Sequence, residues 1–287
     1  MKKIISILTH KLSPSLIFTV SYFSKNIKNE IYIHVDKKTE IEPFLFMARD
    51  NVFFISDRVD VSWGNISVVD ATIKLLEAVK DVNYDSLSLI SGDDIPACNE
   101  LVFDEFLNQN LDKDFIHIQD ERNGFVNPYD RVFKKYPSFV FKKEKNILVN
   151  FILKLNLLPY DARVKKYFTE SGIKLFKGTQ WFTFRKSTIV AMLDFINKNP
   201  HYYESFIHSF CPDEIFFQTI FVHLNLNKYH DKSKLNDCCR YIDWSSGPEY
   251  PKLLNRMDFY NIKNKGYFFA RKVSDNITED DMLYLVN

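Results

Sequence analysis

The sequence predicts an α/β protein with a mostly parallel, twisted central sheet that is flanked by helices. In the first half of the chain, short apolar runs typical of buried strands alternate with helical patterns, and this alternation implies βαβ units. Polar residues follow two of the runs directly, at Asp36 and at Ser91–Asp94, where the carboxyl ends of parallel strands bind ligands. Of the 287 residues, 46% are hydrophobic and 26% are charged, as is usual for a globular chain.

The predicted elements follow in chain order. Apolar runs predict strands at Lys3–Leu8, Glu30–Val35, Asn51–Ser56, Ser86–Ile90 and Phe115–Ile118. Helices are predicted between them at Ser13–Ser24 and at Asn65–Lys80, and in the second helix Ile66, Val69 and Ile73 recur at steps of three and four. Later in the chain we expect a strand at Lys177–Arg185, helices at Ser187–Asn197 and Pro212–His223, and a strand at Cys238–Asp243.

Residues 122–170 break this alternation. Lysines such as Lys134 and Lys142 alternate there with aromatic residues such as Phe133 and Phe151, without a repeat or a linker. We therefore predict a single domain over residues 1–287, with a helical, basic-aromatic insertion at 122–170. Two interpretations of residues 132–157 stay open: an insertion packed on the domain, or a surface that docks on anionic membrane lipids.

Charge and targeting signals exclude several classes of protein. Lys and Arg number 38 against 37 Asp and Glu, so the formal net charge of +1 gives no indication of a nucleic-acid binder. The apolar run after Met1 is too short for a signal peptide, and no stretch reaches the ~20 apolar residues of a membrane span. The spacing of the four cysteines fits neither a disulfide framework nor a zinc site. We expect a cytoplasmic protein, with peripheral contact on the inner membrane surface as an extension of the docking idea.

The three tryptophans lie in short blocks that also contain glycine. These blocks are Trp63-Gly64, Gly178-Thr179-Gln180-Trp181 and Trp244-Ser245-Ser246-Gly247. Aromatic rings beside residues that let the backbone approach a ligand favour a cleft lined with ring faces, which suit sugars. For any one block, a packed turn explains the pattern as well or better.

The block Pro212-Asp213-Glu214 opens a predicted helix. Proline suits the first helical position and acidic residues suit the positive helix end, so helix initiation alone explains it. The same setting keeps a carboxylate ionised, and an ionised Glu214 beside an acceptor hydroxyl is a candidate general base.

Two further groups of charged residues have both a structural and a functional interpretation. Arg271, Lys272 and Lys252 could neutralise a departing diphosphate, or could be solvated surface charges. Asp36 and the Asp93-Asp94 pair could bind Mg²⁺, or could form turns at strand ends. With only 7 glycines, the chain has no glycine-rich phosphate-binding loop.

Taken together, the blocks resemble the core-2/I-branching β-1,6-N-acetylglucosaminyltransferase family, which also includes the peptide O-xylosyltransferases. Seven blocks occur in the family's order and span most of the chain. They are Ile33-His34-Val35-Asp36, Val61-Ser62-Trp63-Gly64, Leu89-Ile90-Ser91-Gly92-Asp93-Asp94-Ile95-Pro96, Gly178-Thr179-Gln180-Trp181-Phe182, Pro212-Asp213-Glu214, Arg240-Tyr241-Ile242-Asp243-Trp244 and Phe269-Ala270-Arg271-Lys272. The resemblance implies a GT-A-like nucleotide-sugar-binding fold and an inverting transfer from a UDP-sugar.

The resemblance also implies roles for individual residues. Glu214 corresponds to the family's catalytic base, Asp36 to the residue that contacts uridine, and Lys272 to the lysine that binds the diphosphate. Trp244 lies in the sugar or acceptor site, and Asp94 matches the fixed aspartate of the family's Ser/Cys-Gly-x-Asp pattern. Because the family looks metal-independent, we expect no metal and no other cofactor.

The remaining site predictions complete this picture. With the nucleotide we place Trp63, Arg271 and Lys252, where Lys252 substitutes for an arginine of the animal enzymes that this chain lacks. With the sugar or acceptor we place Asp93, Gln180, Trp181 and Asp213. The disulfides, stem and membrane anchor of the animal enzymes have no counterpart in the sequence.

The sequence leaves three functional interpretations. The first is a bacterial-type inverting enzyme that moves a sugar, with N-acetylglucosamine as the first choice, from a UDP-sugar to a glycan or lipid-linked glycan in surface polysaccharide or lipopolysaccharide synthesis. The alternative is a catalytically inactive carbohydrate- or nucleotide-binding protein on the same fold, although Glu214, Trp244 and Lys272 together argue against it. A nucleotidyltransferase would need a metal and a phosphate loop, and neither is evident.

Overall fold

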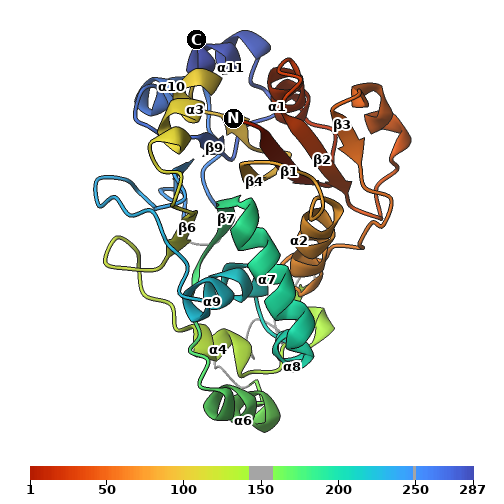
Figure 1. Ribbon diagram of the computed structural model, residues 1–287, viewed down its shortest axis with the longest axis vertical. Coiled ribbons are helices and arrows are strands. Elements are labelled where there is room, and N and C mark those ends of the chain that lie inside the picture. Colours follow the sequence, from red (N-terminus) through yellow and green to blue (C-terminus); the bar gives the residue numbers. More distant parts are fainter. Residues whose placement is uncertain (142–157, 248–249) are drawn as a thin grey trace.

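The protein is built around a six-stranded sheet in the order β3-β2-β1-β4-β7-β6. The computed structural model describes residues 1–141, 158–247 and 250–287 (Figure 1). Strands β1 (Lys3–Thr9), β2 (Glu30–Val35), β3 (Val52–Phe54) and β4 (Ser86–Ser91) are parallel. Strand β7 (Gly178–Arg185) runs antiparallel to β4 and to the edge strand β6 (Phe115–Ile118). The prediction of a mostly parallel α/β sheet is confirmed, with one reversed strand.

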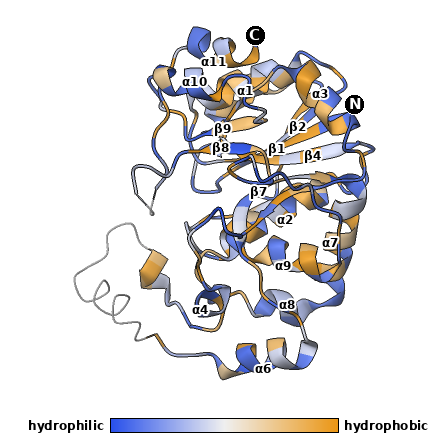
Figure 2. Cartoon of the chain, turned by 90° about the vertical axis from the view of Figure 1, so that its left-hand side faces the viewer, coloured by the Kyte–Doolittle hydropathy of each residue, from blue (hydrophilic) through white to orange (hydrophobic). Residues whose placement is uncertain are grey.

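Helices cover both faces of this sheet (Figure 2). Because side chains alternate along a strand, Ile5 and Ile7 of β1 pack on the side of α1 (Pro14–Ser24) and α3 (Glu100–Asn108). Leu87 and Leu89 of β4 belong to the core on the other face. The helices of that core are α2 (Ser67–Ala78), α7 (Lys186–Lys198), α8 (Pro200–Glu204) and α9 (Phe216–His223).

A second, three-stranded sheet extends the fold at its upper end in Figure 1. It has the order β5-β9-β8 and comprises β5 (Ile95–Pro96), β8 (Arg240–Ile242) and β9 (Phe269–Arg271). Helices α10 (Arg256–Ile262) and α11 (Glu279–Val286) share its hydrophobic core. Sequence analysis predicted a strand at Cys238–Asp243, which contains β8, but it missed β5 and β9, since strands of two or three residues carry no periodicity to detect.

One predicted helix is interrupted. The segment expected as a continuous helix over Pro212–His223 begins with a short 3-10 helix, η3 (Pro212–Glu214), and continues as α9 only from Phe216. Cys211, before η3, has a left-handed φ of 48°, and Ile215 has non-helical dihedral angles. Asp213 and Glu214 therefore belong to η3 and not to α9, which matters for the site below.

The described parts of residues 122–170 contain short helices. These are α4 (Pro128–Val132), the 3-10 helix η2 (Ser138–Phe141) and α6 (Ala162–Ser171), and another 3-10 helix, η1 (Glu42–Met47), precedes β3. Lys142 and Phe151 lie outside the described residues, as does most of the segment 132–157 that we considered for membrane docking. Among the helices of the described ranges, none has the length and apolar character needed to cross a bilayer.

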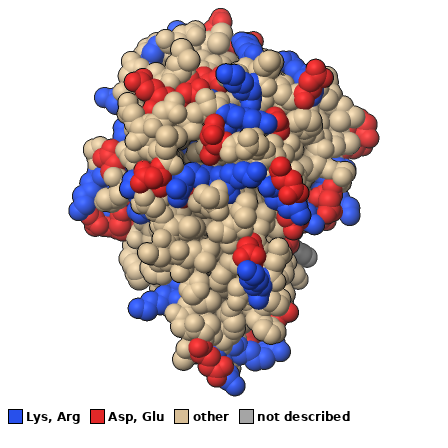
Figure 3. Space-filling model, viewed as in Figure 1, with Lys and Arg blue, Asp and Glu red and all other residues tan. Residues whose placement is uncertain are grey.

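Charges of both signs are spread over the surface. In Figure 3, lysine and arginine side chains form a band across the middle of the molecule, and acidic side chains flank the band. This distribution agrees with the net charge of +1. The side that the figure shows has no uniformly basic face of the kind that binds nucleic acid.

Candidate active site

The candidate site lies at the carboxyl edge of the parallel strands. Asp36 follows β2 directly, and its buried carboxylate accepts backbone N–H groups from Lys38 (3.0 Å) and Val61 (3.4 Å). Through these bonds it joins the loop after β2 to the loop that leads to Trp63. The structure therefore places Asp36 at the carboxyl edge of the parallel strands, as the strand pattern predicted.

A cluster of opposite charges stands at the ends of β1, β4 and β9. The Asp93 carboxylate lies 3.0 Å from the ammonium of Lys272 and 3.3 Å from that of Lys11. These lysines hold the pKa of Asp93 below its ordinary value, although its burial acts in the opposite direction as the largest single influence. Sequence analysis missed Lys11, although it follows β1 just as Asp36 follows β2, and that position was the available signal.

Asp94 and Arg271 form a buried pair behind this cluster. Asp94 accepts hydrogen bonds from the backbone N–H (2.7 Å) and hydroxyl (3.0 Å) of Ser91, and Arg271 Nε lies 3.4 Å away. The Arg271 guanidinium stacks over the ring of Trp181 at 4.0 Å, and Trp181 is 7% exposed. Burial raises the pKa of Asp94, against the influence of Arg271. In this arrangement Trp181 supports Arg271 and offers little surface to a sugar.

Glu214 is held by two cations. Arg131 of α4 lies 2.5 Å and Lys177, just before β7, lies 3.1 Å from the same carboxylate oxygen, Oε2. Across the described ranges, no hydrogen bond is made to Oε1. The two cations fix the orientation of the carboxylate, and Oε1 is the atom that can accept a proton from a ligand.

The neighbouring Asp213 has a different environment. Burial, with the negative charge of Glu214 as a second cause, raises the pKa of Asp213 to about 7. Its Oδ1 is buried and has no hydrogen-bond partner in the described chain. A buried carboxyl group with a raised pKa thus lies next to Glu214, and shifted pKa values are common at catalytic sites.

An exposed aromatic ring, that of Trp63, belongs to a loop that is bonded to the turn before Glu214. Trp63 is 52% exposed, and its ring centroid lies 5.8 Å from Phe210 and 6.3 Å from Tyr250. The backbone carbonyl of Gly64 accepts a 2.8 Å hydrogen bond from the Cys211 N–H, which ties the Trp63 loop to the turn that carries Glu214. Two of the three tryptophan-glycine blocks thus present an exposed ring, because Trp244 is 49% exposed as well.

Two predicted site residues have less to connect them with the charge cluster. The Lys252 ammonium lies 2.5 Å from Asp258 and 3.9 Å from Asp243, so it is engaged within the small sheet and α10. Gln180 lies half-buried on β7, next to Trp181. Of the predicted cations, Lys272 and Arg271 are the two that contact the aspartates after β4.

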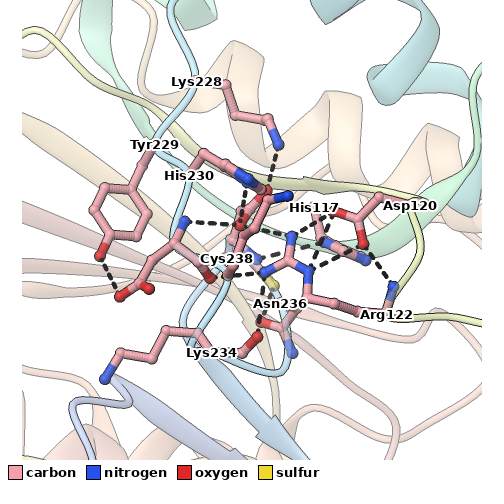
Figure 4. A network of polar contacts seen from close by, with 12 residues as sticks. His117, Asp120, Arg122, Lys228, Tyr229, His230, Lys234, Asn236 and Cys238 are labelled. Atoms are coloured by element: carbon pink, nitrogen blue, oxygen red, sulfur yellow. Dashed lines mark hydrogen bonds and ion pairs between the residues drawn. The ribbon is translucent and has the colours of Figure 1, made fainter.

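A separate polar network lies at the end of β6 (Figure 4). His117, Asp120 and Asp237 have the spacing of metal ligands, and they form the one such group within the described ranges. Asp237 is bound by Arg122 at 2.8 Å and also by Lys228, while Asp120 contacts Arg122 at 2.6 Å. Because cations already engage both carboxylates, the network links the loops around residues 120 and 230 to each other.

Comparison with known proteins supports the sequence resemblance. The profile of the family described as Core-2/I-Branching enzyme matches residues 6–264. Among curated proteins, the comparison found no match.

Solved structures give distant matches. A Bacillus anthracis protein assigned as a glucose-1-phosphate thymidylyltransferase, in complex with a sucrose, has a TM-score of 0.33 and 12% identity over 66% of this chain and 74% of its own. Residues 1–349 of S. aureus TarS have a TM-score of 0.34 and 11% identity, over 77% of this chain and 56% of that structure. At these values neither structure assigns a function.

Proposed function

The chain belongs to the core-2/I-branching enzyme family and is therefore a glycosyltransferase with a GT-A-like α/β fold, and we propose that it is an inverting enzyme that uses a UDP-sugar. In this proposal the acceptor is a glycan hydroxyl and Glu214 is the general base. Lys272 binds the diphosphate of the donor, and Asp36 binds the uridine. N-acetylglucosamine is the proposed sugar, and a bacterial surface polysaccharide or lipopolysaccharide the proposed product.

The geometry of Glu214 is the observation that carries the proposal. Arg131 and Lys177 both bind Oε2, so the carboxylate has one fixed and one available oxygen. A general base needs such a fixed orientation, with its proton-accepting atom within hydrogen-bond reach of the substrate. The exposed rings of Trp63 and Trp244 are the surfaces proposed to contact sugar rings beside it.

The proposed reaction is a single in-line displacement. The acceptor oxygen attacks the anomeric carbon while its proton moves to Oε1 of Glu214. The bond between the anomeric carbon and the diphosphate oxygen breaks, and UDP leaves from the opposite face with the electron pair. Positioning and charge stabilisation supply the catalysis, without a covalent intermediate on the protein.

We propose that cationic side chains take the place of a metal at the diphosphate. The two aspartates that could bind Mg²⁺ face cations instead: Asp93 faces Lys11 and Lys272, and Asp94 faces Arg271. A divalent ion would have to displace these groups to reach the carboxylates. A cytoplasmic location with peripheral membrane contact remains a proposal, which binding to anionic liposomes at low salt would test.

The test is calorimetric titration of UDP and a panel of UDP-sugars in excess chelator, followed by a transfer assay with the sugar that binds best. Glu214→Gln should lower turnover by about 10²-fold or more and leave UDP affinity unchanged, since the base acts on the acceptor proton. Glu204→Gln, which changes an exposed residue of helix α8, is the matched control and should retain normal turnover.

Three outcomes would contradict parts of the proposal. Normal turnover by Glu214→Gln would exclude the assigned base. UDP binding that requires Mn²⁺ would replace the cationic diphosphate site by a metal site. UDP-sugar binding without transfer to any glycan offered would favour the alternative of an inactive binding protein on this fold.

A further inference from the structure

We propose that Lys11 is a second diphosphate-binding cation, and that Asp93 is the internal counter-ion that pairs with Lys11 and Lys272 until the diphosphate of the donor replaces it. This inference rests on the proposed use of a UDP-sugar. It adds a residue that the sequence motifs did not single out, and it assigns Asp93 to the cations rather than to the sugar.

The two ammonium groups are placed as a pair. Lys272 lies 3.0 Å from Oδ2 of Asp93, and Lys11 lies 3.3 Å from Oδ1. Each lysine thus binds a different oxygen of one carboxylate, and the two come from separate elements, after β1 and after β9. A diphosphate likewise offers anionic oxygens on two adjacent groups, which a pair of cations can bind one each.

The three side chains differ in solvent exposure as a ligand site requires, because both lysines are accessible and Asp93 is buried. The side chains of Lys11 and Lys272 are 40% and 35% exposed, so an incoming anion can reach both, whereas that of Asp93 is 9% exposed. The Asp93 backbone is fixed on both sides, because its N–H donates to the Ser91 hydroxyl (3.2 Å) and its carbonyl accepts from Val273 (3.0 Å). Lysine side chains are flexible, so their ammonium groups can turn towards a diphosphate while Asp93 stays in place.

Two other ionisable groups near this position, Asp275 and His10, affect how strongly the two lysines can bind an anion. Lys11 also binds Asp275 at 2.8 Å, but Asp275 is 56% exposed and its attraction is screened by solvent. His10 lies within electrostatic reach of Asp93 and Lys272, and burial lowers its pKa, so at neutral pH it adds no full charge. A diphosphate carries more negative charge than Asp275, and in this proposal it is bound next to Lys272. It can therefore replace Asp275 as the ion-pair partner of Lys11.

Comparing the affinity for UDP with the affinity for uridine measures the contribution of the diphosphate, which uridine lacks. Lys11→Met should weaken UDP binding by about tenfold or more, the usual size of a charge-assisted hydrogen bond, and leave uridine affinity unchanged. Lys11→Arg keeps the charge and should restore most of the UDP affinity, which would also show that the methionine variant did not act through misfolding. Lys198→Met, which removes an exposed lysine paired with Asp194 on α7, is the control and should bind UDP normally.

Asp93→Asn tests the counter-ion. With the internal carboxylate gone, the two ammonium groups have lost their competitor, so UDP affinity should rise several-fold while uridine affinity is constant. Unchanged UDP binding by Lys11→Met, or equal losses for UDP and uridine, would overturn the role of Lys11. Weaker UDP binding by a folded Asp93→Asn variant would overturn the role of Asp93. A wild-type protein that binds no UDP would instead refute the proposed function on which both roles rest.

Discussion

At the scale of single residues, the adjacent carboxyl groups of Asp213 and Glu214 have different surroundings. Asp213 and Glu214 share a short 3-10 helix, yet Asp213 is enclosed while Glu214 is held by Arg131 and Lys177. Since burial raises the pKa of Asp213 to about 7, this group gains or loses its proton near neutral pH. Ionisation of Asp213 places a second negative charge beside the proposed base, and we expect this charge to favour transfer of the acceptor proton.

We therefore predict that kcat/KM rises with pH through about 7, and that Asp213→Asn removes this rise. The asparagine imitates the protonated acid, so the variant should keep roughly the low-pH rate of the wild type across the range. The measurement is a pH–rate profile of both proteins between pH 5.5 and 8.5. The same step near pH 7 in the variant would show that another group is responsible.

At the scale of elements, β7 connects β4, the strand before Asp93 and Asp94, with the residues around Glu214. It pairs with both β4 and β6, and Lys177 precedes it directly. At its first residue, Gly178, a Cβ atom would lie 1.7 Å from the carbonyl oxygen of His117. The close approach of two backbones, and not an unusual dihedral angle, requires glycine at this position.

Gly178→Ala should accordingly lower the free energy of unfolding by at least about 2 kcal/mol, because a backbone atom cannot move aside as a flexible side chain can. Gly124→Ala is the matched control, since a Cβ there meets nothing within 4 Å. Urea denaturation of the two variants and the wild type measures both effects. Equal stability of the two variants would mean that β6 and β7 separate easily at this point.

At the scale of the whole molecule, several buried groups have pKa values shifted in opposite directions. Burial lowers the pKa of His34 and His117 and raises that of Asp94 and Asp213. These groups act oppositely on stability below neutral pH, so the total curve is a sum of opposing contributions. One group can still be isolated by comparing a variant with the wild type.

His34 is suitable for this comparison. Its Nε2 accepts a 2.9 Å hydrogen bond from the Val59 N–H, which requires the neutral ring. Its folded pKa is lowered, so the stability that it contributes is full above the ordinary value of about 6.5 and is lost as pH falls towards the folded value. The stability advantage of the wild type over His34→Gln should therefore shrink between pH 7.5 and 5, as measured by urea denaturation. An advantage that grows on acidification would reverse the assignment.

The periodic elements could be predicted because their cause is local. Strands β2 (Glu30–Val35) and β6 (Phe115–Ile118) begin and end at the predicted residues. A short apolar run between polar residues is typical of a buried strand, and the polar residues mark its ends. Asp36 was found for the same reason, as the residue after a parallel strand. Glu214 was singled out by its motif and by the chemistry of a carboxylate at a helix start, although that helix proved to be interrupted.

Pairings between distant residues were decided by the tertiary structure alone. Nothing in the sequence connects Lys11 with Lys272, or Arg131 with Glu214, because each pair is brought together by strands and loops far apart in the chain. For Lys252 and Trp181 the residue type suited a ligand site, but the fold gave each of them a partner within the protein. Lys252 pairs with Asp258, and Trp181 stacks against Arg271. The sequence by itself determined the mostly parallel sheet, the polar residues at its carboxyl edge and the family. Which charged groups meet at that edge depended on packing between elements, and local sequence patterns do not record such packing.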